Sequence, residues 1–207
     1  DSFSGKINLI NADTLQDTFN FYSKTSLNKT FRNGFWVLTS LRFFYIYEFM
    51  KKYNIKDVIH LENDVLLYYN CDDILDKFDK KLIYMPFDTF KRNIASIMYI
   101  PSHELLKIVL DIYDFSKNDM ENFYNIKNKT HLINTLPIFP KNQTLNAEII
   151  FVSQNYGIFK YEFDAAAIGQ YLGGVDPKNI PNNTIGFVNE TCVIKYNNYN
   201  FVWLTID

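Results

Sequence analysis

The sequence predicts an α/β domain in which a mostly parallel central sheet is flanked by helices. Segments with helical and strand patterns alternate along the first half of the chain, and no linker-like stretch or internal repeat divides it. A length of 207 residues is enough for one full-sized hydrophobic core. We therefore expect a single domain over residues 1–207, with an irregular C-terminal third.

The first expected elements are a helix, a strand and an acidic turn. Residues 36–53 repeat apolar side chains at helical spacing, and this helix should end at Asn54. Residues 57–61 are typical of a short apolar strand, which leads into Glu62-Asn63-Asp64. A possible earlier strand of the sheet covers residues 6–10.

The next expected elements continue the alternation. Residues 72–80 carry acidic residues early and lysines late, which suits a helix dipole. Residues 82–87 and 94–100 are expected to be strands. Pro101-Ser102 should begin a helix over residues 103–115, with Ser102 as the N-cap. After about Asn125 the pattern weakens, and glycines and prolines divide the chain into loops and short elements.

Composition and charge narrow the classes of function. With 47% hydrophobic and 21% charged residues, the chain has the composition of a globular protein. A net charge of −2 argues against a broad nucleic-acid-binding surface. No apolar run reaches transmembrane length and the first residues lack a signal-peptide pattern, so we expect a cytoplasmic protein without a membrane span. The first residue is Asp1 rather than methionine, which is compatible with a piece of a longer protein.

The acidic turn Glu62-Asn63-Asp64 is the first candidate site. Ligands of open α/β sheets bind beyond the carboxyl ends of strands, where this turn should lie. Two carboxylates at such a turn suit Mg²⁺ or Mn²⁺, which complete their coordination with substrate phosphates. The alternative is an ordinary solvated acidic turn, which the spacing alone does not exclude.

The order of segments around this turn resembles metal-dependent glycosyltransferases of the GT-A fold, a Rossmann-like fold. In that family an Arg-bearing helix leads into a strand that ends in Asp-x-Asp. Here Ser40-Leu41-Arg42-Phe43 belong to the predicted helix, and Glu62-Asn63-Asp64 follow the strand. The chain is most similar to the capsid and surface-glycan glycosyltransferases of large DNA viruses and some bacteria. It is more distantly similar to the glycogenin and lipopolysaccharide-galactosyltransferase group.

Three further stretches carry this resemblance, which covers roughly residues 35–178. Residues 92–100 are similar to the family's strand beside the donor sugar, and Asn118-Asp119-Met120 stand where relatives carry an Asp-Gln pair near the anomeric carbon. Residues 163–177 resemble the viral and bacterial members. The resemblance implies catalytic roles for two acids, Asp119 and Asp164. It implies contacts with the nucleotide-sugar donor for Arg42, Glu62, Asn63, Asn93 and Ser96. Asp88 is a further candidate for binding sugar hydroxyls, because it falls at the end of the strand expected over residues 82–87.

Two departures from the family pattern affect the metal. The triplet is Glu-Asn-Asp, so Asp64 is the safer ligand. Glu62 is better suited to contact a metal ligand, rather than the metal itself, or to bind the donor's ribose. Many relatives also supply a late histidine to the metal. The last histidine here is His131, which we keep as a candidate ligand.

Ordinary structural roles remain open for the same residues. Arg42 could form a surface ion pair, Asp119 could cap a helix, and Asp164 could hold the Ala-rich turn that follows it. We expect His60 to be a buried, hydrogen-bonded histidine rather than a ligand.

The resulting expectation is a glycosyltransferase that moves a sugar from a UDP- or GDP-sugar to a glycan or glycoprotein acceptor, with Mn²⁺ or Mg²⁺ as cofactor. Whether the reaction retains or inverts configuration stays open. The alternatives are a non-catalytic sugar- or nucleotide-binding module on the same fold and, more remotely, a nucleotidyltransferase.

Overall fold

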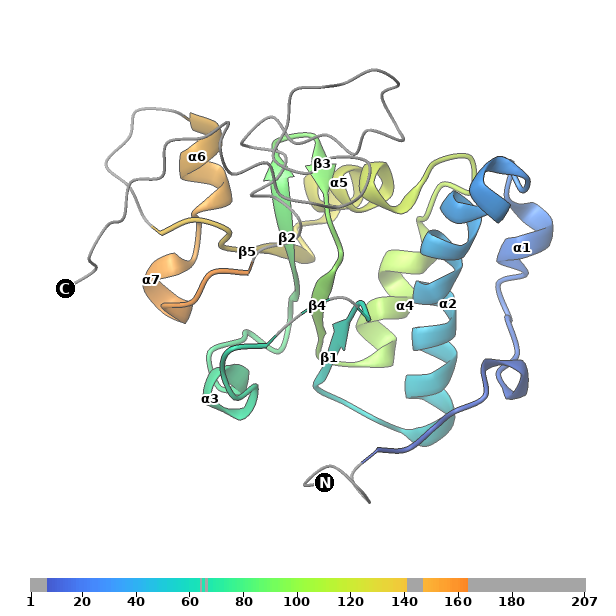
Figure 1. Cartoon of the computed structure of the whole chain (residues 1–207), viewed down its shortest axis with the longest axis horizontal. Helices are drawn as coiled ribbons and strands as arrows, with labels where there is room; N and C mark the ends of the chain where they lie inside the picture. The colour runs from blue at the N-terminus through green and yellow to red at the C-terminus, as the bar shows by residue number, and fades with distance from the viewer. Residues whose placement is uncertain (1–6, 64, 66, 141–146, 164–207) are drawn as a thin grey trace, which may run out of the picture.

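The computed structural model describes residues 7–163, apart from 64, 66 and 141–146. These residues form a five-stranded sheet with helices on both faces (Figure 1). The α/β class expected from the sequence is confirmed. The predicted site residues Asp64 and Asp164, and the remainder of the C-terminal segment, lie outside the described residues.

The sheet is mixed, and most of its strand pairs are antiparallel. Its strands are β1 (Val58–Leu61), β2 (Ile83–Thr89), β3 (Arg92–Asn93), β4 (Ile97–Ile100) and β5 (Ile133–Leu136). The pairs β1–β4, β2–β4 and β2–β3 are antiparallel, and β2–β5 is parallel. The expectation of a mostly parallel sheet was therefore wrong.

The short connection after β2 explains this difference. Only Phe90 and Lys91 separate β2 from β3, and a parallel pair needs a crossover of a dozen or more residues. The chain therefore turns back at once, and β4 continues in the same direction to lie between β1 and β2. β5 runs parallel to β2 because two helices, α4 and α5, separate it from β4.

Helix α2 (Phe35–Tyr53) is the longest element and matches the expected helix. It begins after Gly34, whose φ of +82° is in the left-handed region that favours glycine. It ends at Asn54, also left-handed, whose N–H donates to the carbonyls of Lys51 and Met50. Phe43, Phe44 and Tyr47 face the core, although the helix is apolar around much of its circumference.

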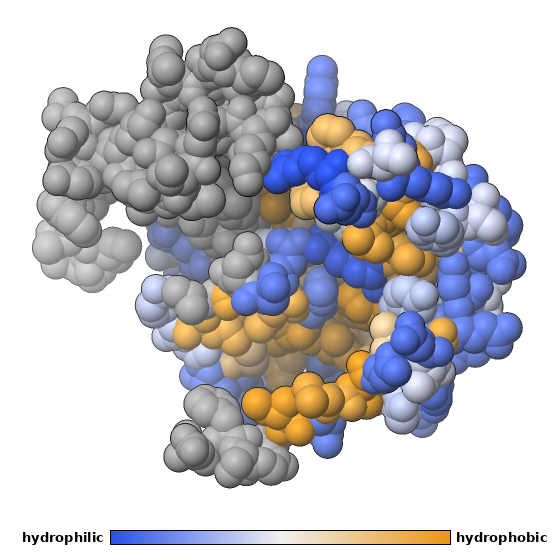
Figure 2. All heavy atoms as spheres, turned by 45° about the vertical axis from the view of Figure 1, so that its right-hand side comes forward, coloured by the Kyte–Doolittle hydropathy of each residue, from blue (hydrophilic) through white to orange (hydrophobic). Residues whose placement is uncertain are grey.

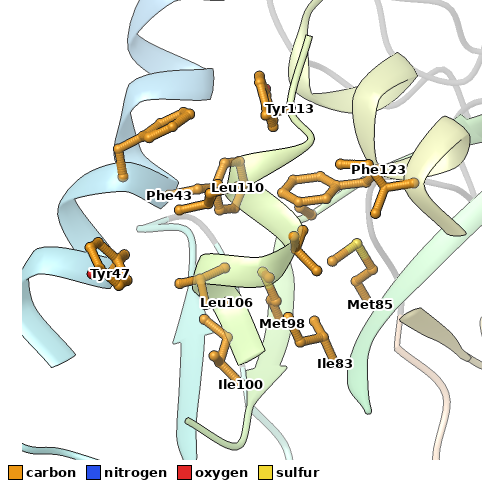
Figure 3. Close-up of a cluster of buried hydrophobic side chains, with 14 of the residues drawn as sticks. Phe43, Tyr47, Ile83, Met85, Met98, Ile100, Leu106, Leu110, Tyr113 and Phe123 are labelled. Atoms are coloured by element: carbon orange, nitrogen blue, oxygen red, sulfur yellow. The ribbon is translucent and has the colours of Figure 1, made fainter. Parts of the chain in front are cut away.

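Two separate apolar clusters cover the two faces of the sheet. Ile83 and Met85 of β2, with Met98 of β4, pack under α2, α4 and α5 (Figure 3). The alternate residues Tyr84 and Tyr99 point to the other face, toward α3 and α7. This alternation follows from the two-residue period of a strand. Helices α2, α4 and α5 thus form one layer, and α2 and the first turn of α5 carry the candidate site.

The later helices differ in part from the expected ones. Helix α3 (Asp72–Leu75) is shorter than expected, and α4 (His103–Asp111) begins at Ser102 as predicted. Helix α5 (Asp119–Thr130) was not expected as a helix, and neither was β5 as a strand. Short helices follow in α6 (Ala147–Val152) and α7 (Tyr156–Phe159). Residues 119–136 are therefore more regular than the sequence suggested, whereas the described part of the last third consists of short elements, as expected.

The N-terminal segment lies along the outside of α2. It contains α1 (Phe21–Lys24) and the 3-10 helices Ala12–Thr14 and Phe31–Asn33. Residues 7–10 form no strand and leave Ile7 and Leu9 exposed, so the expected first strand is absent from the described part of that segment. Figure 2 shows such apolar side chains at the surface among polar ones. Within the described residues, no helix is long and apolar enough to cross a membrane.

Candidate functional site

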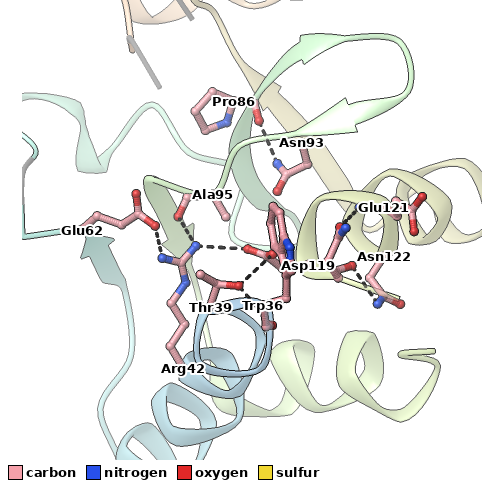
Figure 4. A network of polar contacts seen from close by, with 11 residues as sticks. Trp36, Thr39, Arg42, Glu62, Pro86, Asn93, Ala95, Asp119, Glu121 and Asn122 are labelled. Atoms are coloured by element: carbon pink, nitrogen blue, oxygen red, sulfur yellow. Dashed lines mark hydrogen bonds and ion pairs between the residues drawn. The ribbon is translucent and has the colours of Figure 1, made fainter. Parts of the chain in front are cut away.

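A polar network centred on Arg42 joins four segments of the chain (Figure 4). The Arg42 Nη1 group donates to Glu62 Oε1, and Nη2 lies 3.2 Å from Asp119 Oδ2. Nη2 also lies 3.5 Å from the carbonyl oxygen of Ala95. The side chains of Arg42 and Glu62 are 22% and 31% exposed, whereas that of Asp119 is 5% exposed. One guanidinium therefore connects α2, the turn after β1, the segment before β4 and the start of α5.

Asp119 lies in the first turn of α5, in the interior. Asn118 caps the helix by accepting the Glu121 N–H at 3.0 Å, which fixes the start of α5. Thr39 Oγ1 of α2 lies 3.4 Å from Asp119 Oδ1. Burial raises the pKa of the Asp119 carboxyl, while Arg42 and hydrogen bonds from nearby backbone N–H groups hold it lower than burial alone would. The position of Asp119 thus depends on both α2 and α5.

Glu62 stands at the end of β1, as the sequence predicted for the acidic turn. Its backbone N–H donates to the Ser96 carbonyl at 2.8 Å, and its carbonyl accepts from Val65 at 3.2 Å, which closes the turn. Asn63 is exposed at the turn, and Asp64 lies outside the described residues. The acidic turn is therefore held by backbone hydrogen bonds on one side and by Arg42 on the other.

Asn93 and Ser96 contribute buried polar atoms beside this network. Asn93 is fully buried, and its Nδ2 donates to the Pro86 carbonyl at 2.7 Å across the β2–β3 turn. Asn93 Oδ1 and Ser96 Oγ have no hydrogen-bond partner among the described residues. A buried polar atom left unpaired costs about 1–3 kcal/mol, so each such atom calls for a partner. Strand β3 also packs against α5, so Asn93 lies close to the first turn that carries Asp119 (Figure 4).

A cleft of about 520 Å³ adjoins the network on its outer side. It is lined on one side by Thr89, Lys91 and Arg92, and on the other by Asn118, Met120 and Glu121. Each wall contains residues that are adjacent in sequence to a buried one. Arg92 precedes Asn93, and Asn118 and Met120 flank Asp119. The volume lies in the range of small-molecule pockets, and the lining is polar and charged.

The remaining candidates divide into those outside the site and those outside the described part. His131 caps the C-terminal end of α5 and is exposed, about 18 Å along the helix from Asp119. It is therefore not a ligand at this site, because the helix separates it from the acidic turn. Asp88 belongs to β2, but its side chain is outside the described part, as is all of Asp164.

His60 precedes the acidic turn on β1. Its Nε2 is buried with no partner among the described residues, which differs from the hydrogen-bonded histidine expected at this position. Burial, with Arg42 nearby, lowers the pKa of the His60 ring to about 4. The ring is therefore neutral near pH 7, and it adds no positive charge to the network.

Sequence reasoning missed Thr39 and the carbonyl of Ala95. Thr39 lies three residues before Arg42, so the two share one face of α2, and this spacing could have identified it. The role of Ala95 could not have been found in this way, because it depends on an irregular segment. Residues 94–96, which were expected to be strand, separate β3 from β4 and direct the Ala95 and Ser96 carbonyls toward Arg42 and Glu62.

No protein-family model, curated protein or solved structure matches this chain. Functional inference therefore depends on the residues themselves. Among the described residues, no group of three or more His, Cys, Asp or Glu side chains could hold a metal ion. Glu62 already has one carboxylate oxygen paired with Arg42, so its chemistry suits a neighbour of a metal better than a primary ligand.

Proposed function

We propose that this chain is a metal-dependent glycosyltransferase that moves a sugar from a UDP- or GDP-sugar to a glycan or glycoprotein acceptor. The observation that carries the proposal is the convergence of Arg42, Glu62, Asn93, Ser96 and Asp119 from separate elements at the end of β1. The resemblance to GT-A glycosyltransferases implies donor contacts for the first four of these residues and a catalytic role for Asp119. A polar site of this kind at a strand end is where such a donor would bind.

The chemistry of the side chains fits the groups of a nucleotide sugar. Arg42 offers a planar set of N–H donors that suits phosphate oxygens better than a lysine would. Asn93 Oδ1 and Ser96 Oγ lack partners among the described residues, but both side chains are about as buried as that of Asp119, so in this proposal they support the wall of the donor site. The adjoining cleft, with Thr89, Asn118 and Glu121 in its walls, offers polar groups for the acceptor.

The proposed metal would be held at the acidic turn, by Asp64 together with the donor's diphosphate. Bound Mn²⁺ or Mg²⁺ supplies a Lewis acid that offsets charge on the leaving diphosphate. The ion pair with Arg42 leaves Glu62 to orient the turn. This arrangement makes Asp64 the residue on which metal binding depends.

A thermal-shift experiment tests the proposal. Mn²⁺ or Mg²⁺ with UDP or GDP should stabilise the chain by about 2.7 kcal/mol at a ligand concentration of 100 times Kd. For a chain of this size that corresponds to a rise in Tm of about 5–10 °C. Asp64→Ala should abolish the rise, whereas Asp111→Asn, at the exposed end of α4, should keep it. No rise in the wild-type protein with any combination of metal and nucleotide would contradict the proposal.

A second candidate is a non-catalytic sugar- or nucleotide-binding module. The observation that favours it is the ion pair between Glu62 and Arg42, because it engages a carboxylate that stands where the family carries a metal-binding Asp. Both candidates predict binding of a nucleotide sugar. Slow release of free sugar from the donor would exclude the module, and binding without turnover of any donor would support it.

A further inference from the structure

Asp119 is poorly placed to touch a substrate. A carboxylate that takes a proton from an acceptor, or that faces the anomeric carbon, must be reachable by that ligand. The Asp119 side chain is only 5% exposed and lies behind Arg42, between the first turn of α5 and helix α2. By contrast Arg42 and Glu62, its partners in the network, both reach solvent.

The hydrogen-bonding capacity of the Asp119 carboxylate is already in use. Oδ2 accepts from Arg42 Nη2 at 3.2 Å, and Oδ1 lies 3.4 Å from Thr39 Oγ1. The backbone N–H groups of Asp119 and Met120 also hydrogen-bond to it, and these contacts hold its pKa below the value that burial alone would give. Burial still raises the pKa of this carboxyl overall, so what keeps it from acting on a substrate is that its oxygens are enclosed and already engaged by Arg42 and Thr39.

The same contacts fix the orientation of Arg42. Its two terminal nitrogens are held by carboxylates from different segments, Nη1 by Glu62 and Nη2 by Asp119, and Nη2 also reaches the Ala95 carbonyl. Because the guanidinium is planar, contacts at both nitrogens define its plane as well as its position. Loss of Asp119 would remove the shorter of the two Nη2 contacts described here, at 3.2 Å, and would keep the longer one to the Ala95 carbonyl, at 3.5 Å.

We infer that Asp119 is a positioning residue that orients the Arg42 guanidinium at the acidic turn, and that it does not act on the substrate. The ligand to which Arg42 is presented, a nucleoside diphosphate, rests on the proposed function. The orientation of Arg42 does not rest on it. Thr39 belongs to the same network, because its hydroxyl contacts the second oxygen of the Asp119 carboxylate.

Arginine side-chain NMR tests the orientation directly. In the ¹⁵N-labelled protein, Arg42, assigned with Arg42→Lys, should give separate Nη signals because its rotation is hindered. Asp119→Asn removes the charge at almost constant shape, so these signals should merge or broaden. Asp119→Glu keeps the charge and should restore them in part. Glu104→Gln, an exposed acid in the first turn of α4, is the matched control and should change nothing at Arg42.

Nucleotide affinity gives the second measurement. Asp119→Asn should weaken binding of UDP or GDP with Mn²⁺ by about 10- to 100-fold, the effect of losing one charge-assisted contact. Any donor hydrolysis should keep its pH profile in this variant, because the proton-accepting group is elsewhere. If Asp119→Asn instead removed the part of the pH–rate profile that reports a catalytic base, Asp119 itself would be the proton acceptor. That result would overturn the inference.

The two proposals fail in different ways. If the wild-type chain binds no nucleotide, the proposed function fails, while the Arg42 signals still decide the positioning role. Separate Arg42 signals in Asp119→Asn would overturn the positioning role even if nucleotide binds. Should Asp119→Asn not fold, Thr39→Val allows the same measurements, with partial merging of the Arg42 signals and about 3-fold weaker binding expected. Unchanged Arg42 signals in Thr39→Val would then overturn the inference.

Discussion

Arg42 compensates a buried negative charge, and the stability of the chain should depend on it. Arg42→Ala leaves Asp119 buried with its main cationic partner removed. Removing one partner of a buried pair costs about 3–5 kcal/mol, so we expect a loss of that size in urea unfolding near pH 7.5. Arg42→Lys, which keeps the charge but not the planar fork, should lose less. A loss below about 1 kcal/mol in Arg42→Ala would mean that water reaches Asp119.

The effect of Arg42→Ala should shrink at low pH. Burial raises the pKa of Asp119 and Arg42 opposes that rise, so the pKa in the variant should be higher still. A carboxyl whose pKa is raised on folding destabilises the folded state as pH rises through that pKa, and this penalty disappears when the group is protonated. We therefore expect a smaller difference between variant and wild type near pH 5 than near pH 7.5. His60 stays neutral over this window, because its pKa is about 4.

At the scale of single residues, the sequence identifies site members better than it identifies their contacts. Arg42, Glu62 and Asp119 can each be selected from the sequence by resemblance and position. Their meeting cannot, because it depends on how α2 and α5 pack on the sheet. The burial of Asp119 likewise follows from packing, so it could not be predicted from the sequence. The placement of His131 at the far end of α5 could be recognised only once that helix was known.

Among the helices, the N-caps of α4 and α5 form a natural matched pair. Ser102 Oγ accepts from the Leu105 N–H at 3.3 Å, and Asn118 Oδ1 accepts from the Glu121 N–H at 3.0 Å. Ser102→Ala and Asn118→Ala should each cost about 1 kcal/mol in denaturant unfolding. Only Asn118→Ala should also weaken nucleotide binding, since α5 carries Asp119 and α4 carries no member of the network. Equal nucleotide affinities in the two variants would mean that the start of α5 does not contribute to ligand binding.

The sequence does contain signals for a helix at α5, although that helix was not predicted. Helix α5 has an Asn cap, acids in its first turn and lysines in its last, and a polar cap followed by an acid is also what correctly located the start of α4. It escaped notice because its polar residues weaken the apolar repeat. The break between β3 and β4 carries no such signal. Residues 94–96 contain no glycine or proline that would mark a break, and the contacts of Ala95 and Ser96 explain the interruption.

At the scale of the whole molecule, both apolar clusters share the same strands and should unfold together. Phe123 lies in the cluster under α2, α4 and α5, and Phe78 in the cluster on the opposite face. Phe123→Ala and Phe78→Ala should each cost about 3–5 kcal/mol. Far-UV circular dichroism and tryptophan fluorescence should report a single unfolding transition in both variants. Two transitions, with only one moved by a given variant, would mean that the faces fold independently.

The class of the fold is accessible from the sequence, but the direction of its strands is not. Alternation of helix and strand patterns predicts helices on a sheet, and the two-residue period predicts which side chains of β2 face each layer. Strand direction depends on connection lengths. Between the strands expected over residues 82–87 and 94–100, the chain turns at Phe90 and Lys91. This turn is too short for the crossover that connects parallel strands. Reading that turn as a hairpin would have corrected the expected sheet.

The sharing of one guanidinium by several segments also has an evolutionary consequence. A substitution of Arg42 leaves two carboxylates, Glu62 and Asp119, without their common partner, so single changes at these positions are penalised more than joint ones. Across homologous chains, positions 42, 62 and 119 should therefore vary together. A homologue with a neutral residue at position 42 should also lack the acid at position 119, and its acidic turn should be supported by a different side chain.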